Sequence, residues 1–218
     1  MSTTDRDVFN RTEGKAFRNW LLSLVATAIA TAVCVIWVDR PAAEFFDRHF
    51  PQAEWRLWID RFIAPFDAAV LAALVFLLAC GTWVISGRRL ASWTRTLTLC
   101  SWAAMWAAAA DIILKHVFGR GWIDPTYLGD GLYGFHFLNG SPHWDCFPSG
   151  TASISSAVAA VLWIVTPRSR WWGLLIVVLL CAGVLVTNYH WVGDVVAGVF
   201  IGLSIGWMTV RLLVDEHG

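Results

Sequence analysis

The residues best suited to chemistry are a histidine and an aspartate near the carboxyl end of the chain. His190 and Asp194 are four residues apart, and an apolar run begins between them at Val192. If a helix begins near Tyr189, both side chains project from one helical face. A carboxylate beside an imidazole fixes the tautomer of the ring and raises its basicity. This pair suits a nucleophilic or general-base histidine; the alternative is a structural pair that caps the helix.

Two further features indicate an anion site. Lys115 and Arg120 follow another apolar run, and an arginine binds phosphate oxygens through two parallel hydrogen bonds. Ser149 and Gly150 begin a further apolar run, and the free N–H groups at the amino end of a helix favour an anion. The structural alternatives are snorkelling charges at a helix end and a serine that only caps its helix.

A polar stretch separates these features. Residues 115–151 form a long connection between apolar runs, which is usually functional or disordered, and its many aromatic residues argue against disorder. The stretch carries His136 and His143. Asp111 lies inside the preceding apolar run, and we expect it to pair with Lys115 or with a polar group of another span.

The composition indicates a membrane protein. The chain is 57% hydrophobic and 15% charged, whereas soluble domains are about 25% charged. Fifteen tryptophans are typical of anchoring at a membrane interface. A formal net charge of zero gives no reason to expect nucleic acid as a partner. The five cysteines form no CxxC pair, so we expect free thiols with no metal centre and no cofactor.

Six apolar runs are candidate membrane spans, because a bilayer core of ~30 Å needs roughly 20 apolar residues and shorter runs also occur. The predicted fold class is all-α: a polytopic six-helix transmembrane bundle, with residues 1–218 forming a single integral membrane domain. The spans are Trp20–Val38, Ala68–Ile85, Leu97–Leu114, Thr151–Val165, Trp171–Val186 and Val192–Leu213.

Basic residues predict the orientation of these spans. Lysines and arginines precede the first span, lie between the second and third and between the fourth and fifth, and end the sixth. The positive-inside rule therefore predicts that both termini are cytoplasmic. We expect no signal peptide, because the first eighteen residues are polar. Residues 39–67 fall on the outer side, as one or two amphipathic helices on the interface or as a solvated hairpin.

The order of these residues resembles the type 2 phosphatidic acid phosphatase superfamily, whose members share a six-helix core with vanadium haloperoxidases. The family pattern is Lys, six residues, Arg-Pro; then Pro-Ser-Gly-His; then Ser-Arg, five residues, His, three residues, Asp. The resemblance covers about residues 97–213, the phosphatase-like core. Its matching positions are Lys115, Ser149, Gly150, His190 and Asp194.

The chain departs from the family pattern at several positions. Thr151 stands where the family has the second-motif histidine, and Gly183 and Val184 stand where it has Ser-Arg. Arg120 lies two residues early, and Trp122 occupies the expected arginine position. A bacterial branch of the family has Gly-Arg-x-Trp and Asn-Tyr-His, which this chain also carries.

The resemblance implies a role for each site residue. His190 would attack phosphorus and form a phosphohistidine, with Asp194 supporting it. The phosphate oxygens would be bound by the cradle formed by Lys115, Arg120, Ser149 and Gly150, with Asn188 as a further substrate contact.

The proton donor is the open question. The family's acid position is Thr151, whose hydroxyl is a poor donor near neutral pH. His143 or His136, in the polar stretch, are the alternatives, and a pyrophosphate substrate would need the acid less.

We therefore expect a metal-independent lipid phosphatase or phosphotransferase at the periplasmic face of a bacterial inner membrane. Its substrate would be a phospholipid phosphate, an isoprenyl phosphate or pyrophosphate, or lipid A, and its other partners would be membrane lipids. The first alternative is a catalytically silent relative that binds a lipid phosphate or a protein partner. A transporter is disfavoured, because no paired broken spans occur in two halves of the chain.

Overall fold

The computed structural model describes the backbone of residues 3–50, 52–87 and 91–214. These residues form helices and no strand; an isolated bridge joins Arg120 to Phe135. Three short helical segments, η1 (Cys34–Val38), η2 (Ile123–Tyr127) and η3 (Pro142–Trp144), accompany the α-helices. The α-helices are α1 (Thr3–Val33), α2 (Asp39–His49), α3 (Gln52–Ile85), α4 (Ser92–Phe118), α5 (Gly150–Val165), α6 (Arg170–Val186) and α7 (Val192–Val214).

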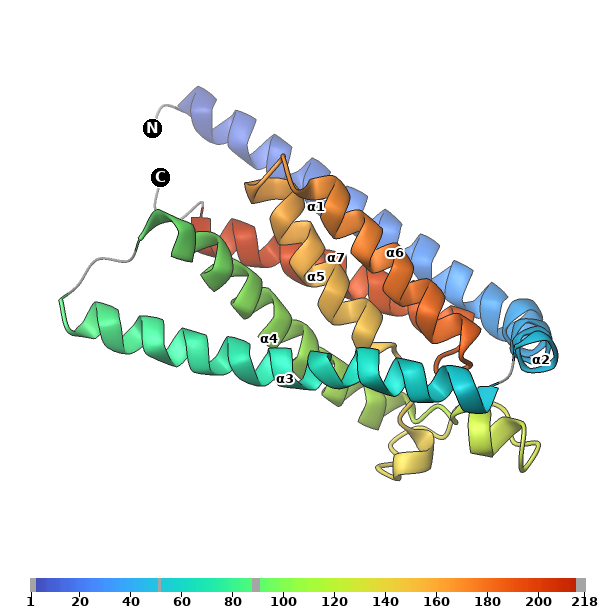
Figure 1. Cartoon of the computed structure of the whole chain (residues 1–218). Helices are drawn as coiled ribbons and strands as arrows, with labels where there is room; N and C mark the ends of the chain where they lie inside the picture. The colour runs from blue at the N-terminus through green and yellow to red at the C-terminus, as the bar shows by residue number, and fades with distance from the viewer. Residues whose placement is uncertain (1–2, 51, 88–90, 215–218) are drawn as a thin grey trace.

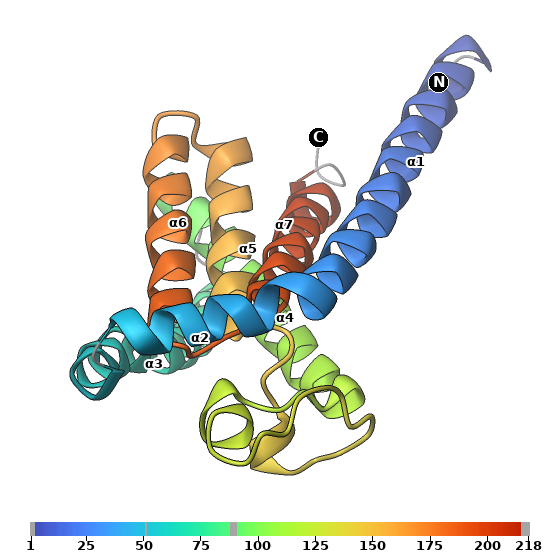
Figure 2. The same cartoon turned by 90° about the vertical axis from the view of Figure 1, so that its right-hand side faces the viewer.

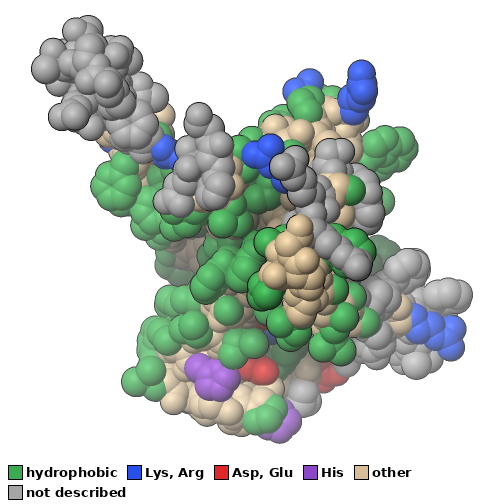
Figure 3. All heavy atoms as spheres, turned by 90° about the vertical axis from the view of Figure 1, so that its left-hand side faces the viewer, with side chains coloured by type: hydrophobic (Ala, Val, Ile, Leu, Met, Phe, Trp, Pro, Cys, Tyr) green, Lys and Arg blue, Asp and Glu red, His purple; other side chains and the backbone are tan. Residues whose placement is uncertain are grey.

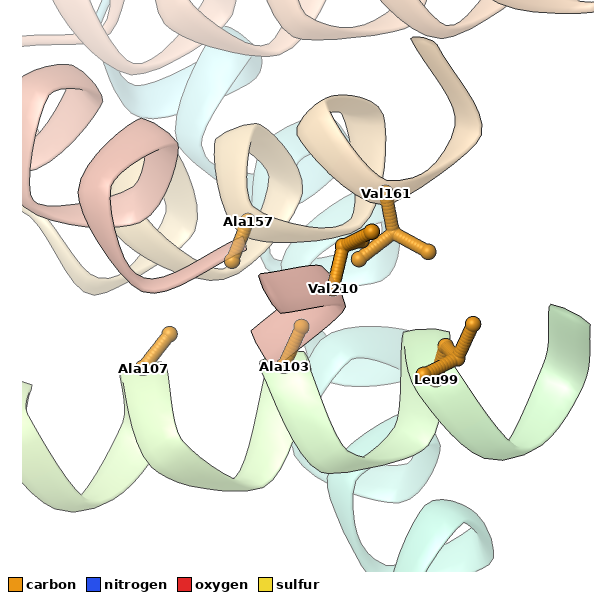
Figure 4. Packing of buried hydrophobic residues seen from close by; sticks show 6 residues of the cluster. All are labelled: Leu99, Ala103, Ala107, Ala157, Val161 and Val210. Atoms are coloured by element: carbon orange, nitrogen blue, oxygen red, sulfur yellow. The ribbon is translucent and has the colours of Figure 1, made fainter. Parts of the chain in front are cut away.

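Helix α5 lies at the centre of the bundle and packs against α4, α6 and α7, while α1 packs on α7 and α3 on α4 (Figure 1). The interior of the bundle is built from small and β-branched residues, which let the helices approach closely. In Figure 4, side chains from α4, α5 and α7 point toward one another. They are Leu99, Ala103, Ala107, Ala157, Val161 and Val210.

The predicted all-α membrane bundle is confirmed. Three helical stretches, Gly14–His49, Thr94–Phe118 and Val192–Val214, are long and apolar enough to cross a membrane, and three shorter apolar helices accompany them. The short ones are Val70–Ile85, Gly150–Val165 and Arg170–Val186. Many large apolar side chains of these helices are exposed, and they cover much of the visible side surface in Figure 3. A bilayer accounts for this exposure, because it replaces water as the solvent there.

The segment 39–67 differs from the prediction in its second half. We expected interfacial helices over this whole segment, but Gln52 already begins α3, which runs unbroken to Ile85. With 34 residues, α3 is roughly 51 Å long at 1.5 Å per residue, so it extends beyond a hydrocarbon core of ~30 Å. The predicted second span is therefore the carboxyl half of a longer helix.

The first half of that segment is α2, an amphipathic helix. The π-helical segment η1 joins α1 to α2, and such segments often occur at functional sites. Figure 2 shows α2 turned away from the direction of α1 and lying across the end of the bundle. This turn carries Asp39, the first residue of α2, into the protein interior, where it is 1% exposed.

The ends of the bundle differ in character. The start of α1, the end of α7 and the α5–α6 turn lie at one end (Figure 1). The α6–α7 turn and the connection 119–149 lie at the other, beside α2 (Figures 1 and 2). The histidines visible in Figure 3 also lie at this second end, which we call the loop end.

Glycines on one face of α7 bring its backbone against α5. A Cβ atom added at Gly202 would lie 2.1 Å from the carbonyl oxygen of Ser153, and one at Gly206 would lie 2.4 Å from that of Ala157. The adjacent turn repeats the pattern, because a Cβ atom at Gly198 would lie 2.7 Å from the Ser149 carbonyl oxygen. No larger residue fits at these positions unless the two helices separate.

Gly202→Ala should therefore destabilise the protein, because an added methyl group forces the α5 and α7 backbones apart. Overpacking of this kind costs about 1–3 kcal/mol. Unfolding in a mild detergent, followed by circular dichroism, measures the effect. Gly81→Ala is the matched control: it also replaces a helical glycine, but nothing lies within 4 Å of its added Cβ atom. Equal stabilities of the two variants would contradict this account of the α5–α7 contact.

Candidate active site

His190 lies in a tight turn between α6 and α7, at the loop end. Helix α6 ends at Val186 and α7 begins at Val192. The expected helix start near Tyr189 would have placed His190 on the helix, but His190 precedes it. Asn188 has a positive φ of 52°, a conformation that asparagine tolerates better than most residues. The side chain of Asn188 donates to the Ala43 carbonyl oxygen at 2.9 Å. Asn188 therefore ties the turn to α2.

A buried cysteine lies beside the histidine–aspartate pair. His190 Nδ1 is 3.7 Å from Asp194 Oδ2, which is longer than a hydrogen bond. Cys146 Sγ lies 3.1 Å from Asp194 Oδ2 and 3.4 Å from His190 Nδ1. The Nδ1 side of the ring thus faces the thiol and the carboxylate. In the neutral tautomer with a proton on Nδ1, Nε2 carries the free electron pair.

Asp194 is held by a buried arginine, which a second carboxylate shares. Arg120 Nη1 lies 2.5 Å from Asp194 Oδ1, and Nη2 lies 2.5 Å from Asp39 Oδ2. Asp39 also accepts a hydrogen bond from the Gly193 backbone at 2.9 Å, so α2, the start of α7 and the polar connection meet here. Burial lowers the pKa of Arg120, but the carboxylates of Asp194 and Asp39 outweigh it and the net shift is upward.

Aromatic rings enclose the guanidinium of Arg120. Its Cζ atom lies 5.0 Å from the ring centroid of Phe135, 5.1 Å from that of Trp191 and 5.5 Å from that of Tyr133, within the range of cation–π attraction. The Tyr133 hydroxyl accepts from Nη2 at 3.0 Å and donates to the Val35 carbonyl oxygen. Burial raises the pKa of Tyr133 to about 12, so this hydroxyl stays protonated. Arg120 therefore binds groups of the protein itself, with no exposed surface for a phosphate to reach.

A second ion pair meets the amino end of α5. Lys115 Nζ lies 3.2 Å from Asp111 Oδ2, the pairing expected from their spacing. A Cβ atom added at Gly150 would lie only 2.9 Å from Asp111 Oδ2, so the carboxylate packs against the first residue of α5. Among the described residues Asp111 Oδ1 is buried and has no hydrogen-bond partner. The Lys115 side chain is 20% exposed and is the more accessible partner of this pair.

Ser149 joins the two clusters. Its backbone N–H donates to the Asp194 carbonyl oxygen at 3.1 Å, and its hydroxyl accepts from the Ala152 N–H at 3.4 Å as the cap of α5. Gly150 and Thr151 follow in the first turn and are buried. Of the features expected to form one anion site, Lys115 meets the start of α5 through Asp111, and Ser149 joins that helix to Asp194. Arg120 is connected to them through its ion pair with Asp194.

The two histidines of the polar connection lie further out. Both His136 and His143 have exposed side chains. The His136 ring packs on Trp144 with centroids 3.8 Å apart, and His143 contributes its carbonyl oxygen to the Trp122 N–H. In the described hydrogen bonds neither imidazole reaches His190 or the α5 amino end.

Trp122 covers the catalytic candidate. Its ring centroid lies 5.5 Å from that of His190 and 5.1 Å from that of Tyr189. The indole N–H donates to Asp145 Oδ1 at 2.6 Å, which fixes the ring in place. His190 is consequently only 3% exposed. Trp122, which stands at the family's arginine position, therefore covers His190 with an apolar ring.

Sequence reasoning missed two members of this site. Asp39 follows an apolar run and precedes Arg40 and Pro41; a carboxylate at such a span end needs a partner, and that was the available signal. Cys146 was expected only as an inert thiol, and all five cysteines are free as predicted. Burial, and then the Asp194 carboxylate, raise the pKa of Cys146 well above its ordinary value, so its thiol stays protonated at neutral pH.

Cys146, His190 and Asp194 also have the donor atoms of a metal site, since their ligand atoms lie within 4.8 Å of one another. Asp194, however, already accepts hydrogen bonds from Arg120, from the Trp191 backbone and from Cys146. A cation bound there would face the Arg120 guanidinium. The cluster suits an oriented imidazole better than a metal ion.

Comparison with known proteins identifies the family of the chain. No curated protein and no solved structure matches the chain. A model of the PAP2 superfamily matches residues 95–217, more than half of the sequence. The matched region contains Lys115, the α5 amino end, His190 and Asp194, the groups that the fold brings together. The chain belongs to the PAP2 superfamily of membrane phosphatases.

Proposed function

We propose that the protein is a lipid phosphatase or phosphotransferase that removes a phosphoryl group from a lipid phosphate or pyrophosphate. The observation that carries this proposal is that the oriented imidazole of His190 and the amine of Lys115, from α4, converge at the amino end of the buried helix α5. His190 faces Asp194 and Cys146, and Ser149 joins Asp194 to the start of α5. A basic helix end beside a nucleophile suits phosphoryl transfer, which depends on positioning and charge stabilisation.

In the proposed reaction His190 Nε2 attacks phosphorus, and the bond from phosphorus to the leaving oxygen breaks. A phosphohistidine forms, and the imidazolium proton on Nδ1 is stabilised by Asp194. Water or another acceptor hydroxyl then attacks phosphorus, the P–N bond breaks and its electron pair returns to the ring. Lys115 and the first backbone N–H groups of α5, from Gly150 on, bind the phosphate oxygens.

Arg120 and Asn188 have supporting roles in this proposal. Arg120 holds Asp194 through a buried ion pair, so it positions the nucleophile's partner and does not bind the phosphate. Asn188 fixes the α6–α7 turn through Ala43. Thr151 lies in the first turn of α5, at the family's acid position, but its hydroxyl has too little acidity for that role.

The proposed cellular setting is a bacterial inner membrane, with the loop end on the periplasmic side and both termini in the cytoplasm. The distribution of basic residues supports it. A lipid headgroup at that interface lies level with Lys115 at the end of α4, while its chains extend along the apolar helix surfaces.

A silent phosphate-lipid binder is the second candidate, favoured by the 3% exposure of His190 beneath Trp122 and by Thr151. The test is phosphate release by the purified protein in detergent, from phosphatidic acid and from farnesyl pyrophosphate. The active protein releases phosphate and forms an acid-labile phosphoprotein with ³²P-labelled substrate. Binding without release would identify the silent relative, and transfer of label to added alcohols would separate a transferase from a hydrolase.

Lys115→Met should lower phosphate release about 10²-fold or more, because it removes a charge that stabilises the transferred phosphoryl group. Lys15→Met is the control, since Lys15 is an exposed residue near the other end of the bundle. Initial rates with farnesyl pyrophosphate measure the effect. Equal rates in the parent and Lys115→Met would exclude Lys115 from the phosphate cradle.

A further inference from the structure

We propose that Asp111 is the general acid of this site and takes the role that the second-motif histidine has in the family. This inference rests on the proposed phosphatase function. It assigns the proton donor to a carboxylate on α4, which neither the family pattern nor the polar connection indicated.

The position of Asp111 supports the assignment. Its carboxylate packs against Gly150. The next residue, Thr151, stands at the position of the family's histidine. It is bound to Lys115 on one oxygen, and the other oxygen is buried without a hydrogen-bond partner in the described structure. A buried acceptor left unpaired is destabilising, which is reasonable at a catalytic site that acquires its partner with the substrate.

Charge explains how Asp111 would hold a proton when substrate is bound. The phosphate must share Lys115 and the α5 amino end with the Asp111 carboxylate. A second negative charge held beside a carboxylate disfavours the ionised form of that carboxylate. Substrate binding therefore favours protonated Asp111 beside the phosphate. The other ionisable groups that act on Asp111 are Lys115, His190 and the carboxylate of Asp145.

The proton balance of the reaction then closes. In the first step the bond from phosphorus to the lipid oxygen breaks, and the Asp111 carboxyl gives its proton to that oxygen, which leaves as an alcohol. In the second step the Asp111 carboxylate takes a proton from the attacking water while the P–N bond breaks. The carboxyl group is restored and His190 is again neutral.

Other proton donors fit less well. His136 and His143 are exposed, and the His136 ring packs on Trp144. The Cys146 thiol faces His190 Nδ1, on the opposite side of the ring from the attacking Nε2. The Asp145 carboxylate accepts a hydrogen bond from the Trp122 indole N–H. The Asp111 carboxylate, by contrast, packs against Gly150 in the first turn of α5.

The experiment compares the parent with Asp111→Asn, which keeps the shape of the side chain and removes its acidity. The leaving group of phosphatidic acid is the diacylglycerol alkoxide, which needs a proton, whereas that of farnesyl pyrophosphate is farnesyl phosphate, which leaves as a stabilised anion. We expect Asp111→Asn to slow single-turnover release of diacylglycerol about 10²-fold or more, and release of farnesyl phosphate less than about tenfold. The descending limb of the pH–rate profile with phosphatidic acid should disappear as well.

Two further variants complete the design. Asp130→Asn, at an exposed loop aspartate, should match the parent with both substrates. Adding Thr151→His to Asp111→Asn should raise phosphatidic acid turnover at least about tenfold above that of Asp111→Asn alone. This recovery would also establish that the variant is folded. His143→Ala should keep parental turnover with both substrates if Asp111 is the acid.

Each other outcome overturns the proposal. An equal loss with both substrates would show that Asp111 only holds Lys115 in place. Parental turnover of phosphatidic acid by Asp111→Asn, or a selective loss in His143→Ala, would assign the proton elsewhere while leaving the phosphatase function intact. A parent that turns over neither substrate would remove the phosphatase function itself, and this assignment with it.

Discussion

His190→Ala should reduce phosphate release to background, a loss of at least about 10³-fold, because the variant lacks the atom that forms the covalent intermediate. Labelling with ³²P substrate should then give no phosphoprotein. Asp194→Asn should retain a measurable fraction of activity, because it removes the charge that orients and supports the ring but leaves Nε2 in place.

His49→Ala is the matched control for this prediction. His49 is an exposed histidine on α2, at the same end of the molecule, and in the described part of the chain its ring contacts Phe45 of its own helix. It should match the parent in rate and in phosphoprotein yield. Phosphate release by purified His190→Ala at the parental rate would eliminate His190 as the nucleophile.

Arg120→Met should cause the largest loss of stability. Removing the guanidinium leaves the carboxylates of Asp39 and Asp194 buried without their shared cation. Breaking one side of a buried ion pair costs about 3–5 kcal/mol. Unfolding in a mild detergent should show this loss as a lower midpoint and a lower yield of folded protein. Phosphatase activity should fall too, since Asp194 would lose the group that holds it.

A double variant tests the cause of that loss. Adding Asp39→Asn to Arg120→Met removes one uncompensated charge and should recover part of the stability. Arg48→Met is the control, because Arg48 pairs with Glu44 on an exposed helix surface and such pairs contribute about 1 kcal/mol or less. Equal losses in Arg48→Met and Arg120→Met would contradict the buried network described here.

The periodicity and composition of the sequence were sufficient to predict the apolar helices of the bundle, but not where all of them begin. Apolar runs of membrane-spanning length gave ends within a few residues for α4, α5, α6 and α7, because hydrophobic burial in lipid and helical hydrogen bonding are local requirements. The start of α3 at Gln52 was missed, because a helix can continue past the apolar core when its polar residues favour the same backbone conformation. The π-helical turn at Cys34 that directs α2 across the bundle has no comparable pattern.

For the site as well, the sequence was enough for some residues, whereas their contacts needed the tertiary structure. The sequence alone was enough to propose His190, Asp194, Lys115, Ser149 and Gly150 as site residues, because their residue types and order suit the chemistry. The partners of those residues depended on the tertiary structure. Arg120 fits a phosphate ligand by residue type, yet burial between two carboxylates makes it a structural cation, and only packing brings Asp39 from α2 to meet it. From the sequence, Asp111 was expected only to pair with Lys115 or with a polar group of another span, and Cys146 only to be an inert thiol. The tertiary structure places Asp111 against α5 and Cys146 against His190. Contacts between residues distant in sequence depend on how helices pack, and no local pattern encodes them.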